Sequence, residues 1–268
     1  MKSPHSEKLE KKATKRLAQF EIHSLMKEKR SEDMATLEEV FDRPTLMIVY
    51  KLLNTENLRA IHGAVRSGKE SRLYWGKDAK ERDVAVKIYL TTSAEFKRGR
   101  LAYIEGDPRF RRVKRDTRSL VYLWAKKEFT NLAQAAAARV RVPRPILVEG
   151  NVLLMEFVGR EGKPAPLLRE YVPSDPLEVY KSLLRSLKLL YRKAELVHGD
   201  LSEYNIMIWK DQPVIFDMSQ SVSVEHPMSE MMLKRDIENL NGYFGRISVK
   251  VRDPGEVLAW VTEDGIQS

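Results

Sequence analysis

One stretch of the chain places two aspartates and an asparagine at fixed spacing between short apolar runs. Asp200 is followed five residues later by Asn205, and Asp217 comes after the apolar run 214–216. A lone Asp in a polar loop is usually solvated, but this pattern fixes several polar identities and flanks them with two β-like runs. Side chains so placed can gather a hydroxyl nucleophile and Mg²⁺ around the γ-phosphate of ATP. The stretch 197–217 therefore predicts an active site for phosphoryl transfer.

Length and composition limit the remaining choices. The 268 residues suffice for one two-lobed domain or two small ones, and 43% hydrophobic residues support a proper core. The chain has no cysteine, which excludes disulfides and thiolate metal sites. No apolar run approaches the ~18 residues that span a bilayer, and the first residues lack a signal-peptide core. We therefore expect a cytoplasmic protein without a membrane partner.

The positive charge of the chain is clustered. The net charge is +9, with nine Lys or Arg against five Glu in residues 1–32. Residues 97–118 hold nine Lys or Arg against three acids. Such clusters are typical either of a solvated face in a charge-rich protein or of a surface that binds an RNA backbone. RNA or ribonucleoprotein contact is the interpretation that we favour, with no sequence-specific readout implied.

The first part of the chain divides into a helical and a strand-rich segment. Helical periodicity in residues 1–58 is broken at Phe41–Thr45 and continues from Leu46 to Leu53. A turn at 54–57 follows, and alternation then takes over. A long basic loop at 91–116 interrupts the strand-rich segment 59–158. Within these segments we expect a helix at 7–30, strands at 60–65, 71–75 and 83–89, a helix from Asp116 or Thr117 to Val140, and a hairpin of 146–149 with 152–157.

Residues 159–268 are predicted to be mainly helical. Ser174-Asp175-Pro176 is a helix start signal with proline in the first turn. Beyond this helix we expect strands at 206–209 and 214–216 joined by a turn at 210–213, and then helices at 228–242 and 254–263.

A glycine-containing turn lies between the first two predicted strands. Gly63–Lys69 fits the first seven positions of a P-loop, but Glu70 stands where that motif needs a hydroxyl for Mg²⁺. A P-loop also opens into a helix, whereas residues 71–75 alternate like a strand. We therefore reject the P-loop. An ordinary hairpin remains an alternative to a strand–turn–strand that covers phosphates with backbone amides.

Lys87 lies within the apolar strand 83–89. A lysine on a buried face is costly unless it is paired, and ATP phosphates together with a helix carboxylate would compensate it. Glu128 in the following helix is the natural partner, with a snorkelling lysine as the alternative. The connector Met155–Gly159 then joins the strand-rich part to the helical part, and its backbone could contact an adenine edge with Met155 behind the pocket.

Taken together, these motifs resemble the RIO family of atypical serine/threonine protein kinases, and specifically its first subfamily in a minimal, archaeal-like form. The resemblance covers roughly residues 39–245 and rests on Phe41–Leu46, Ser67–Ser71, Ala85–Tyr89, Lys127–Leu132, Leu196–Asn205 and Asp217–Ser221. It implies an α+β, two-lobed protein-kinase-like fold. The expected parts are an N-terminal helical extension (1–58), an N-lobe with an antiparallel sheet plus helix (59–158) and a reduced helical C-lobe (159–268).

The resemblance also implies a role for each matching residue, with ATP and Mg²⁺ or Mn²⁺ as cofactors. Asp200 matches the aspartate that orients or deprotonates the substrate hydroxyl, and Asn205 and Asp217 match the metal ligands. Asp217 further matches a residue assigned as an aspartyl-phosphate acceptor. The matches for nucleotide binding are the phosphate-anchoring Lys87 with its partner Glu128, the glycine-loop residues Ser67, Gly68, Lys69, Glu70 and Ser71, and the hinge residues Met155, Glu156 and Val158.

The implied function is an ATP- and Mg²⁺-dependent serine/threonine kinase, an ATPase or both, acting in maturation of the small ribosomal subunit. Its implied partners are the pre-ribosomal small subunit and its RNA, and autophosphorylation is compatible with this. Only 51 residues follow Asp217, and the chain has no Ala-Pro-Glu motif, so a peptide-docking platform is not expected. Two alternatives stay open: a small-molecule phosphotransferase of the aminoglycoside-kinase type, and an RNA-bound assembly factor gated by nucleotide without substrate phosphorylation.

Overall fold

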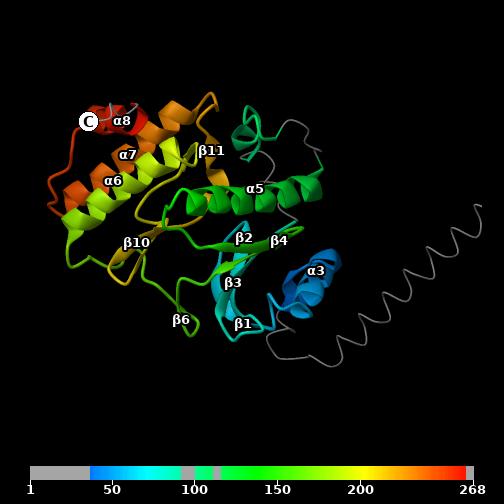
Figure 1. Ribbon diagram of the computed structural model, residues 1–268. Coiled ribbons are helices and arrows are strands. Elements are labelled where there is room, and N and C mark those ends of the chain that lie inside the picture. The colour runs from blue at the N-terminus through cyan, green and yellow to red at the C-terminus, as the bar shows by residue number, and fades with distance from the viewer. Residues whose placement is uncertain (1–36, 92–99, 111–115, 264–268) are drawn as a thin grey trace, which may run out of the picture.

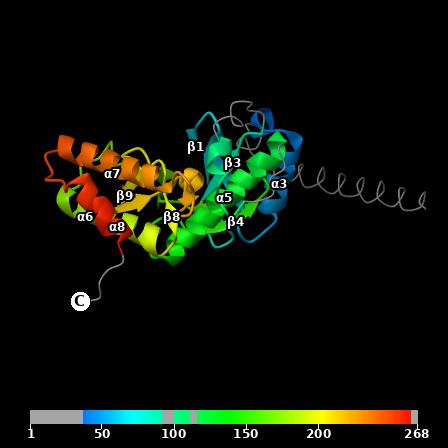
Figure 2. The ribbon, with the colours of Figure 1, turned by 90° about the horizontal axis from the view of Figure 1, so that it is seen from above.

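The structure is a computed structural model that describes residues 37–91, 100–110 and 116–263. The helix predicted at 7–30 lies outside these residues. Within them, none of the helices is both long and apolar enough to cross a membrane. The elements form two groups that lie side by side (Figures 1 and 2), a sheet covered by two helices and a cluster of three helices with short two-stranded ribbons.

A five-stranded antiparallel sheet forms the first group. Its order is β1-β2-β3-β5-β4, and the three strands predicted from alternation are present. Helix α5 lies along one face of the sheet, and α3 covers the other (Figure 1). The elements of this group are α3 (Arg43–Leu53), β1 (Ala60–Ser67), β2 (Ser71–Lys77), β3 (Asp83–Tyr89), α5 (Thr117–Ala137), β4 (Pro145–Glu149) and β5 (Val152–Glu156).

Strand β3 carries one set of side chains to each face of the sheet. Val84, Val86 and Ile88 pack in the core beneath α3, whereas Ala85 joins the core that continues into the helical group. Because strand side chains alternate, Lys87 lies on the same face as Ala85. This alternation directs the lysine toward α5 and the boundary between the two groups, where the Asp217 side chain is partly exposed; this place is called the cleft below.

Local capping sets where the two helices of this group begin. Asp42 accepts a hydrogen bond from the Thr45 backbone N–H at 3.1 Å, and Pro44 occupies the first turn of α3. Asp116 caps α5 in the same way through the Ser119 N–H at 2.9 Å. Helix α5 ends at Ala137, before the predicted end at Val140, because Arg139 takes a left-handed conformation with φ 63°.

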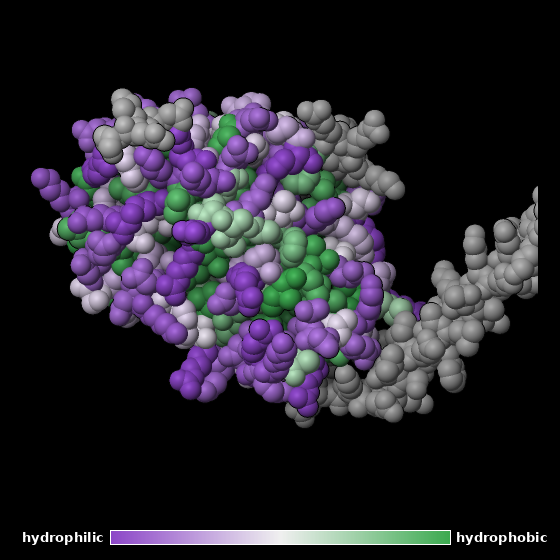
Figure 3. Space-filling model, viewed as in Figure 1, coloured by the Kyte–Doolittle hydropathy of each residue, from purple (hydrophilic) through white to green (hydrophobic). Residues whose placement is uncertain are grey.

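The second group is built on three helices with a hydrophobic core between them. On the face of the molecule that Figure 3 shows, hydrophilic residues predominate, and hydrophobic residues gather mainly below α5. The elements are β6 (Gly159–Arg160), β7 (Lys163–Pro164), α6 (Pro176–Arg192), β8 (Leu196–Val197), β9 (Ile206–Trp209), β10 (Gln212–Ile215), β11 (Val222–Ser223), α7 (Ser229–Arg246) and α8 (Pro254–Thr262), with short 3-10 turns η1 (Leu101–Tyr103) and η2 (Met218–Gln220).

The turn between β9 and β10 is shorter than predicted. Lys210 and Asp211 both have positive φ, at 53° and 56°, and make a two-residue hairpin turn. Gln212 and Pro213 therefore belong to β10, where they pair with Trp209 and Ile208. The prediction of a four-residue turn at 210–213 was wrong in its length, because Pro213 lies in an edge strand, a position with which proline is compatible.

Candidate active site

Lys87 lies between two carboxylates in the cleft. Its Nζ is 2.8 Å from Glu128 Oε1 on α5 and 3.0 Å from Asp217 Oδ1 after β10. The predicted contact between Lys87 and Glu128 is therefore present. The Tyr89 hydroxyl donates to the second oxygen of Glu128, so both oxygens of this buried carboxylate have partners. The β3 face thus presents one ammonium to two carboxylates from different parts of the chain.

The charges in this cluster stabilise one another against burial. Burial alone would lower the pKa of Lys87, but Asp217 and Glu128 raise it well above its ordinary value. Burial would likewise raise the pKa of Asp217, and the neighbouring ammonium of Lys87 instead lowers it to about 2. Lys87 and Asp217 are thus both ionised at neutral pH. The Asp217 side chain keeps 42% of its surface exposed, so it remains accessible from the cleft.

The second predicted aspartate lies in the loop of residues 198–205 between β8 and β9 (the 198–205 loop). Asp200 Oδ2 accepts a hydrogen bond from the Gln220 side chain at 3.0 Å. Asn205 Nδ2 donates to the Asp200 carbonyl at 2.7 Å and to Oδ2 at 3.4 Å. Burial and the charge of Asp217 raise the pKa of Asp200. Two aspartates on one cleft therefore have pKa values displaced in opposite directions.

The 198–205 loop is held from beneath by a buried aspartate of α7. Asp236 accepts the backbone N–H groups of Gly199 and Leu201, each at 2.8 Å. Its burial raises its pKa to about 7. The sequence analysis missed Asp236, although its position among Leu233, Ile237 and Leu240 at helical spacing marks it as a buried acid.

The loop of residues 217–221 after β10 (the 217–221 loop) is held from the opposite side by α5. Lys127 Nζ donates to the carbonyls of Ser219, at 3.1 Å, and Ser221. Asn131 Nδ2 donates to the Met218 and Ser221 carbonyls at 2.7 and 3.0 Å. The sequence analysis quoted both residues within a motif without giving them a role. Their spacing on the face of α5 that carries Glu128 was the available signal.

The predicted glycine turn is the tip of the β1–β2 hairpin. Gly68 N–H donates to the Ser71 carbonyl at 2.9 Å, and β2 starts at Ser71, so the P-loop is excluded as predicted. Leu73 of β2 pairs with Lys87 of β3, which places the hairpin next to the lysine. Glu70 contacts Arg100 in an ion pair, while Ser67, Gly68 and Lys69 are exposed.

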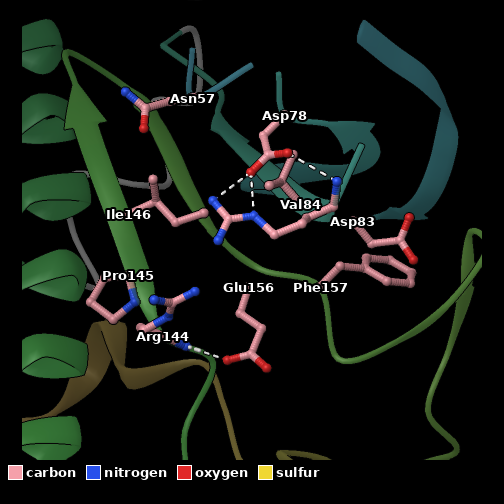
Figure 4. A pocket seen from close by; sticks show the side chains of 10 residues that line it. Asn57, Asp78, Asp83, Val84, Arg144, Pro145, Ile146, Glu156 and Phe157 are labelled. Carbon is pink, nitrogen blue, oxygen red and sulfur yellow. Dashed lines mark hydrogen bonds and ion pairs between the residues drawn. The ribbon is translucent and has the colours of Figure 1, made fainter. Parts of the chain in front are cut away.

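The end of β5 and the connector after it hold the three predicted hinge residues Met155, Glu156 and Val158. Met155 is buried in the core shared by both groups of elements. The Val158 carbonyl accepts from the Ala165 N–H at 2.9 Å. The Glu156 side chain points into a cavity of about 420 Å³ lined also by Val84, Arg144 and Ile146 (Figure 4). Since Val84 and Ile146 belong to the core on the α3 side, this cavity is not the space beside Lys87.

The described basic residues of the 97–118 cluster are engaged within the protein. Arg100 pairs with Glu70, Arg109 with Asp107 and Arg118 with Asp42. Arg109 also donates to the side chains of Asn131 and Gln134 on α5, at 2.8 and 2.9 Å. These three arginines therefore have structural partners, and the other six basic residues of the cluster lie outside the described residues.

Comparison with known proteins identifies the family. The RIO domain model matches residues 72–257, which hold Lys87, Glu128, Asp200 and Asp217. This chain belongs to the RIO family. It is 41% identical over 229 residues to the RIO-type serine/threonine-protein kinase Rio1 of Methanocaldococcus jannaschii, covering 85% of this chain and 78% of the relative. It is 39% identical over 239 residues to the Haloferax volcanii protein of the same name, covering 89% and 81%.

Solved structures agree on the fold. The Rio2 kinase–ADP/Mg²⁺–phosphoaspartate complex from Chaetomium thermophilum superimposes with a TM-score of 0.61 at 24% identity, covering 82% of this chain and 67% of that one. The RIO-family chain therefore has the predicted two-lobed, kinase-like α+β fold. With its relatives, this makes it an atypical protein serine/threonine kinase.

Proposed function

We propose that this RIO-family kinase binds ATP with a divalent cation in the cleft and transfers the γ-phosphoryl group to a serine or threonine hydroxyl. The observation that carries the proposal is the contact of Lys87 with both Glu128 and Asp217. An ammonium fixed by a helix carboxylate suits a phosphate-anchoring role, because its position is set before the nucleotide arrives. The Rio2 complex with ADP and Mg²⁺ is consistent with these cofactors.

The donor set of the cleft fits Mg²⁺. Asp217 offers an accessible carboxylate, with one oxygen contacted by Lys87 and Ser219. Asn205 turns its amide nitrogen toward Asp200, which leaves its amide oxygen for another contact. One carboxylate and one amide oxygen suit Mg²⁺, which often takes one or two carboxylates and fills its octahedron with phosphate oxygens and water.

Each residue then has a distinct task. A cation held by Asn205 and Asp217 would neutralise phosphate oxygens. Lys87 anchors the phosphates, and Asp200 accepts or orients the proton of the attacking hydroxyl, for which its raised pKa is favourable. The hairpin tip at 67–71 covers the phosphates. At the hinge, the engaged Val158 carbonyl leaves the backbone N–H of that residue as the contact for adenine.

Asp217 is also proposed as a phosphate acceptor. A carboxylate oxygen attacking the γ-phosphorus would form an acyl phosphate as the bond to ADP breaks, and water would later release inorganic phosphate. Net ATPase turnover would follow. The phosphoaspartate in the Rio2 complex supports this step. After brief exposure to ATP, hydroxylamine or borohydride should trap the acyl phosphate, whereas acid-stable label on Ser or Thr alone would exclude it.

The biological setting that we propose is maturation of the small ribosomal subunit in the cytoplasm. The net charge of +9 supports contact with ribosomal RNA. Because the three described arginines of the 97–118 cluster are paired internally, neutralising Arg111, Arg112, Lys114 and Arg115 is the informative change. Subunit binding should weaken, with a steep salt dependence, while basal ATPase stays unchanged. Unchanged binding would leave the cluster as a solvated face.

The central test of the proposal removes the anchor. Lys87→Ala should retain the fold but lose most labelled-phosphate transfer, since phosphate positioning is lost. Lys77→Ala, an exchange on the neighbouring strand, is the matched control. Transfer should also vanish in EDTA and return with Mg²⁺ or Mn²⁺. Near-wild-type transfer by Lys87→Ala, or turnover without metal, would refute the assignment.

A further inference from the structure

Gln220 joins the two loops that form the cleft. It lies in η2, three residues after Asp217, and its side-chain Nε2 is 3.0 Å from Asp200 Oδ2. A carboxylate only accepts hydrogen bonds, so the amide nitrogen of Gln220 must be the atom that faces Asp200. This is a direct side-chain contact between the 217–221 loop and the 198–205 loop.

The contact leaves one oxygen of Asp200 in a defined position. Gln220 and Asn205 both donate to Oδ2, at 3.0 and 3.4 Å. With Oδ2 held from two sides, the carboxylate cannot rotate freely, and Oδ1 is the oxygen left for a substrate hydroxyl. Without Gln220, the longer contact from Asn205 is the side-chain hydrogen bond to this carboxylate that remains among the described residues.

The backbone around Gln220 is fixed on both sides. Lys127 and Asn131 of α5 hold the carbonyls of Met218, Ser219 and Ser221. A Cβ added to Gly199 would meet the Gln220 carbonyl oxygen at 3.4 Å, so the backbones of the two loops approach each other at this point. Helix α5 therefore holds the backbone from which the Gln220 side chain extends.

We propose that Gln220 is a positioning residue that orients Asp200 for phosphoryl transfer and couples the 217–221 loop to it. Gln220 acts through Asp200 and contacts no reacting atom. The inference rests on the role proposed above for Asp200. A misplaced acceptor lowers the rate of the chemical step even when nucleotide binding is intact.

The first experiment compares two nearly isosteric variants. Gln220→Met removes the donor, and Gln220→Glu places a second carboxylate against Asp200. Each should lower kcat about 10- to 100-fold, and Gln220→Glu should have the lower kcat of the two. The KM for ATP and the affinity for ATP with Mg²⁺ should stay within about twofold, because the Lys87 cluster is untouched. Gln212→Met, an exposed exchange in β10, is the control and should match wild type.

Two results would overturn the inference. One is an unchanged kcat in Gln220→Met. The other is a kcat loss accompanied by an equal loss of ATP affinity or by a lower Tm, which would mean that Gln220 only holds the loop together.

The second experiment is a double-mutant cycle with Asp200→Asn. If Gln220 acts through Asp200, adding Gln220→Met to Asp200→Asn should change the residual rate by less than about twofold. A full additional loss would overturn the inference. An unchanged rate in Asp200→Asn alone would refute the Asp200 role and this inference together, whereas loss in Asp200→Asn without loss in Gln220→Met would refute only the inference.

Discussion

The two loops of the cleft are held in place by opposite chemistry. The 198–205 loop turns backbone N–H groups toward an anion, Asp236 of α7. The 217–221 loop turns backbone carbonyls toward a cation and an amide, Lys127 and Asn131 of α5. At these contacts the 198–205 loop presents N–H groups to a buried carboxylate, and the 217–221 loop presents carbonyls to a buried ammonium.

The two loops show how far backbone dipoles can compensate the cost of burying a charged side chain. Burial raises the pKa of Asp236 to about 7 despite its two backbone hydrogen bonds. Burial, with the repulsion of Arg109, lowers the pKa of Lys127 to about 7. Both groups are displaced toward their neutral forms, because dipoles offset only part of the loss of water. A full counter-charge, as between Lys87 and Asp217, keeps both partners ionised.

Removing the anion beneath the 198–205 loop should have the largest effect. Asp236→Ala leaves two buried N–H groups without acceptors, and we expect about 2–5 kcal/mol less stability. Phosphoryl transfer should fall as well, because the loop carries Asp200. Urea unfolding followed by circular dichroism measures the change, with the exposed Glu238→Ala on the same helix as control. Equal stability of the two variants would show that Asp236 does not stabilise the 198–205 loop.

His198 links the 198–205 loop to Phe216, which precedes the 217–221 loop, and its contribution to the stability of the fold depends on pH. Nδ1 accepts the Asp200 N–H and Nε2 donates to the Phe216 carbonyl, an arrangement that only the neutral ring can make. Burial lowers the pKa of His198 from 6.5 to about 4. Its contribution to stability is therefore complete above pH 6.5 and is lost as the pH falls through about 4.

By pH 4 this loss should reach roughly 3 kcal/mol. His198→Gln keeps a donor for Phe216 but does not titrate, so the difference in unfolding free energy between wild type and this variant should shrink from pH 7 to pH 4. A difference that is constant with pH would show that His198 is protonated to the same extent in the folded and unfolded states.

Removing the cation above the 217–221 loop should cost less than removing the anion. Lys127→Met keeps an apolar side chain of similar length but loses the ammonium, which lies 5.2 Å from the centroid of the Trp124 ring. Unpaired carbonyls are tolerated better than unpaired N–H groups. We expect about 1–3 kcal/mol less stability and weaker ATP–Mg²⁺ binding, read by isothermal titration. The neighbouring exposed residue supplies the control Lys126→Met. If Lys127→Met lost more stability than Asp236→Ala, the expectation that the 198–205 loop depends more strongly on its buried side chain would be wrong.

The smallest loss of stability is expected for Asn239→Ala, which removes a hydrogen bond to a carbonyl of the 198–205 loop. Asn239 of α7 donates to the Leu201 carbonyl at 3.0 Å, and Asn239→Ala should cost about 1 kcal/mol. Asn131→Ala should cost more, because that side chain serves two carbonyls and Arg109. The Tm values of the two variants in thermal unfolding compare the loss of one hydrogen bond with the loss of a network of three. Equal shifts in Tm would mean that the network adds nothing.

Parts of this arrangement could be predicted from the sequence. Alternation predicted β3, and the cost of burying Lys87 led to Glu128 as its partner. Helical spacing could have indicated that Asp236 and Lys127 lie on buried faces, but it could not predict their partners, because these are backbone groups of distant loops. The turn between β9 and β10 was predicted but made too long, since neither Lys210 nor Asp211 is the glycine or asparagine that usually signals positive φ.

The backbone at Asp217 decides which variant can serve as an inert but folded reference protein. Its φ of 60° and ψ of 57° are left-handed, a conformation that asparagine and aspartate tolerate and that costs other L-residues about 1–2 kcal/mol. Asp217→Ala would therefore combine lost chemistry with local distortion of the loop that carries Gln220. Asp217→Asn removes the charge on a backbone that still fits, and it is the form in which occupancy on a large assembly can be studied apart from turnover.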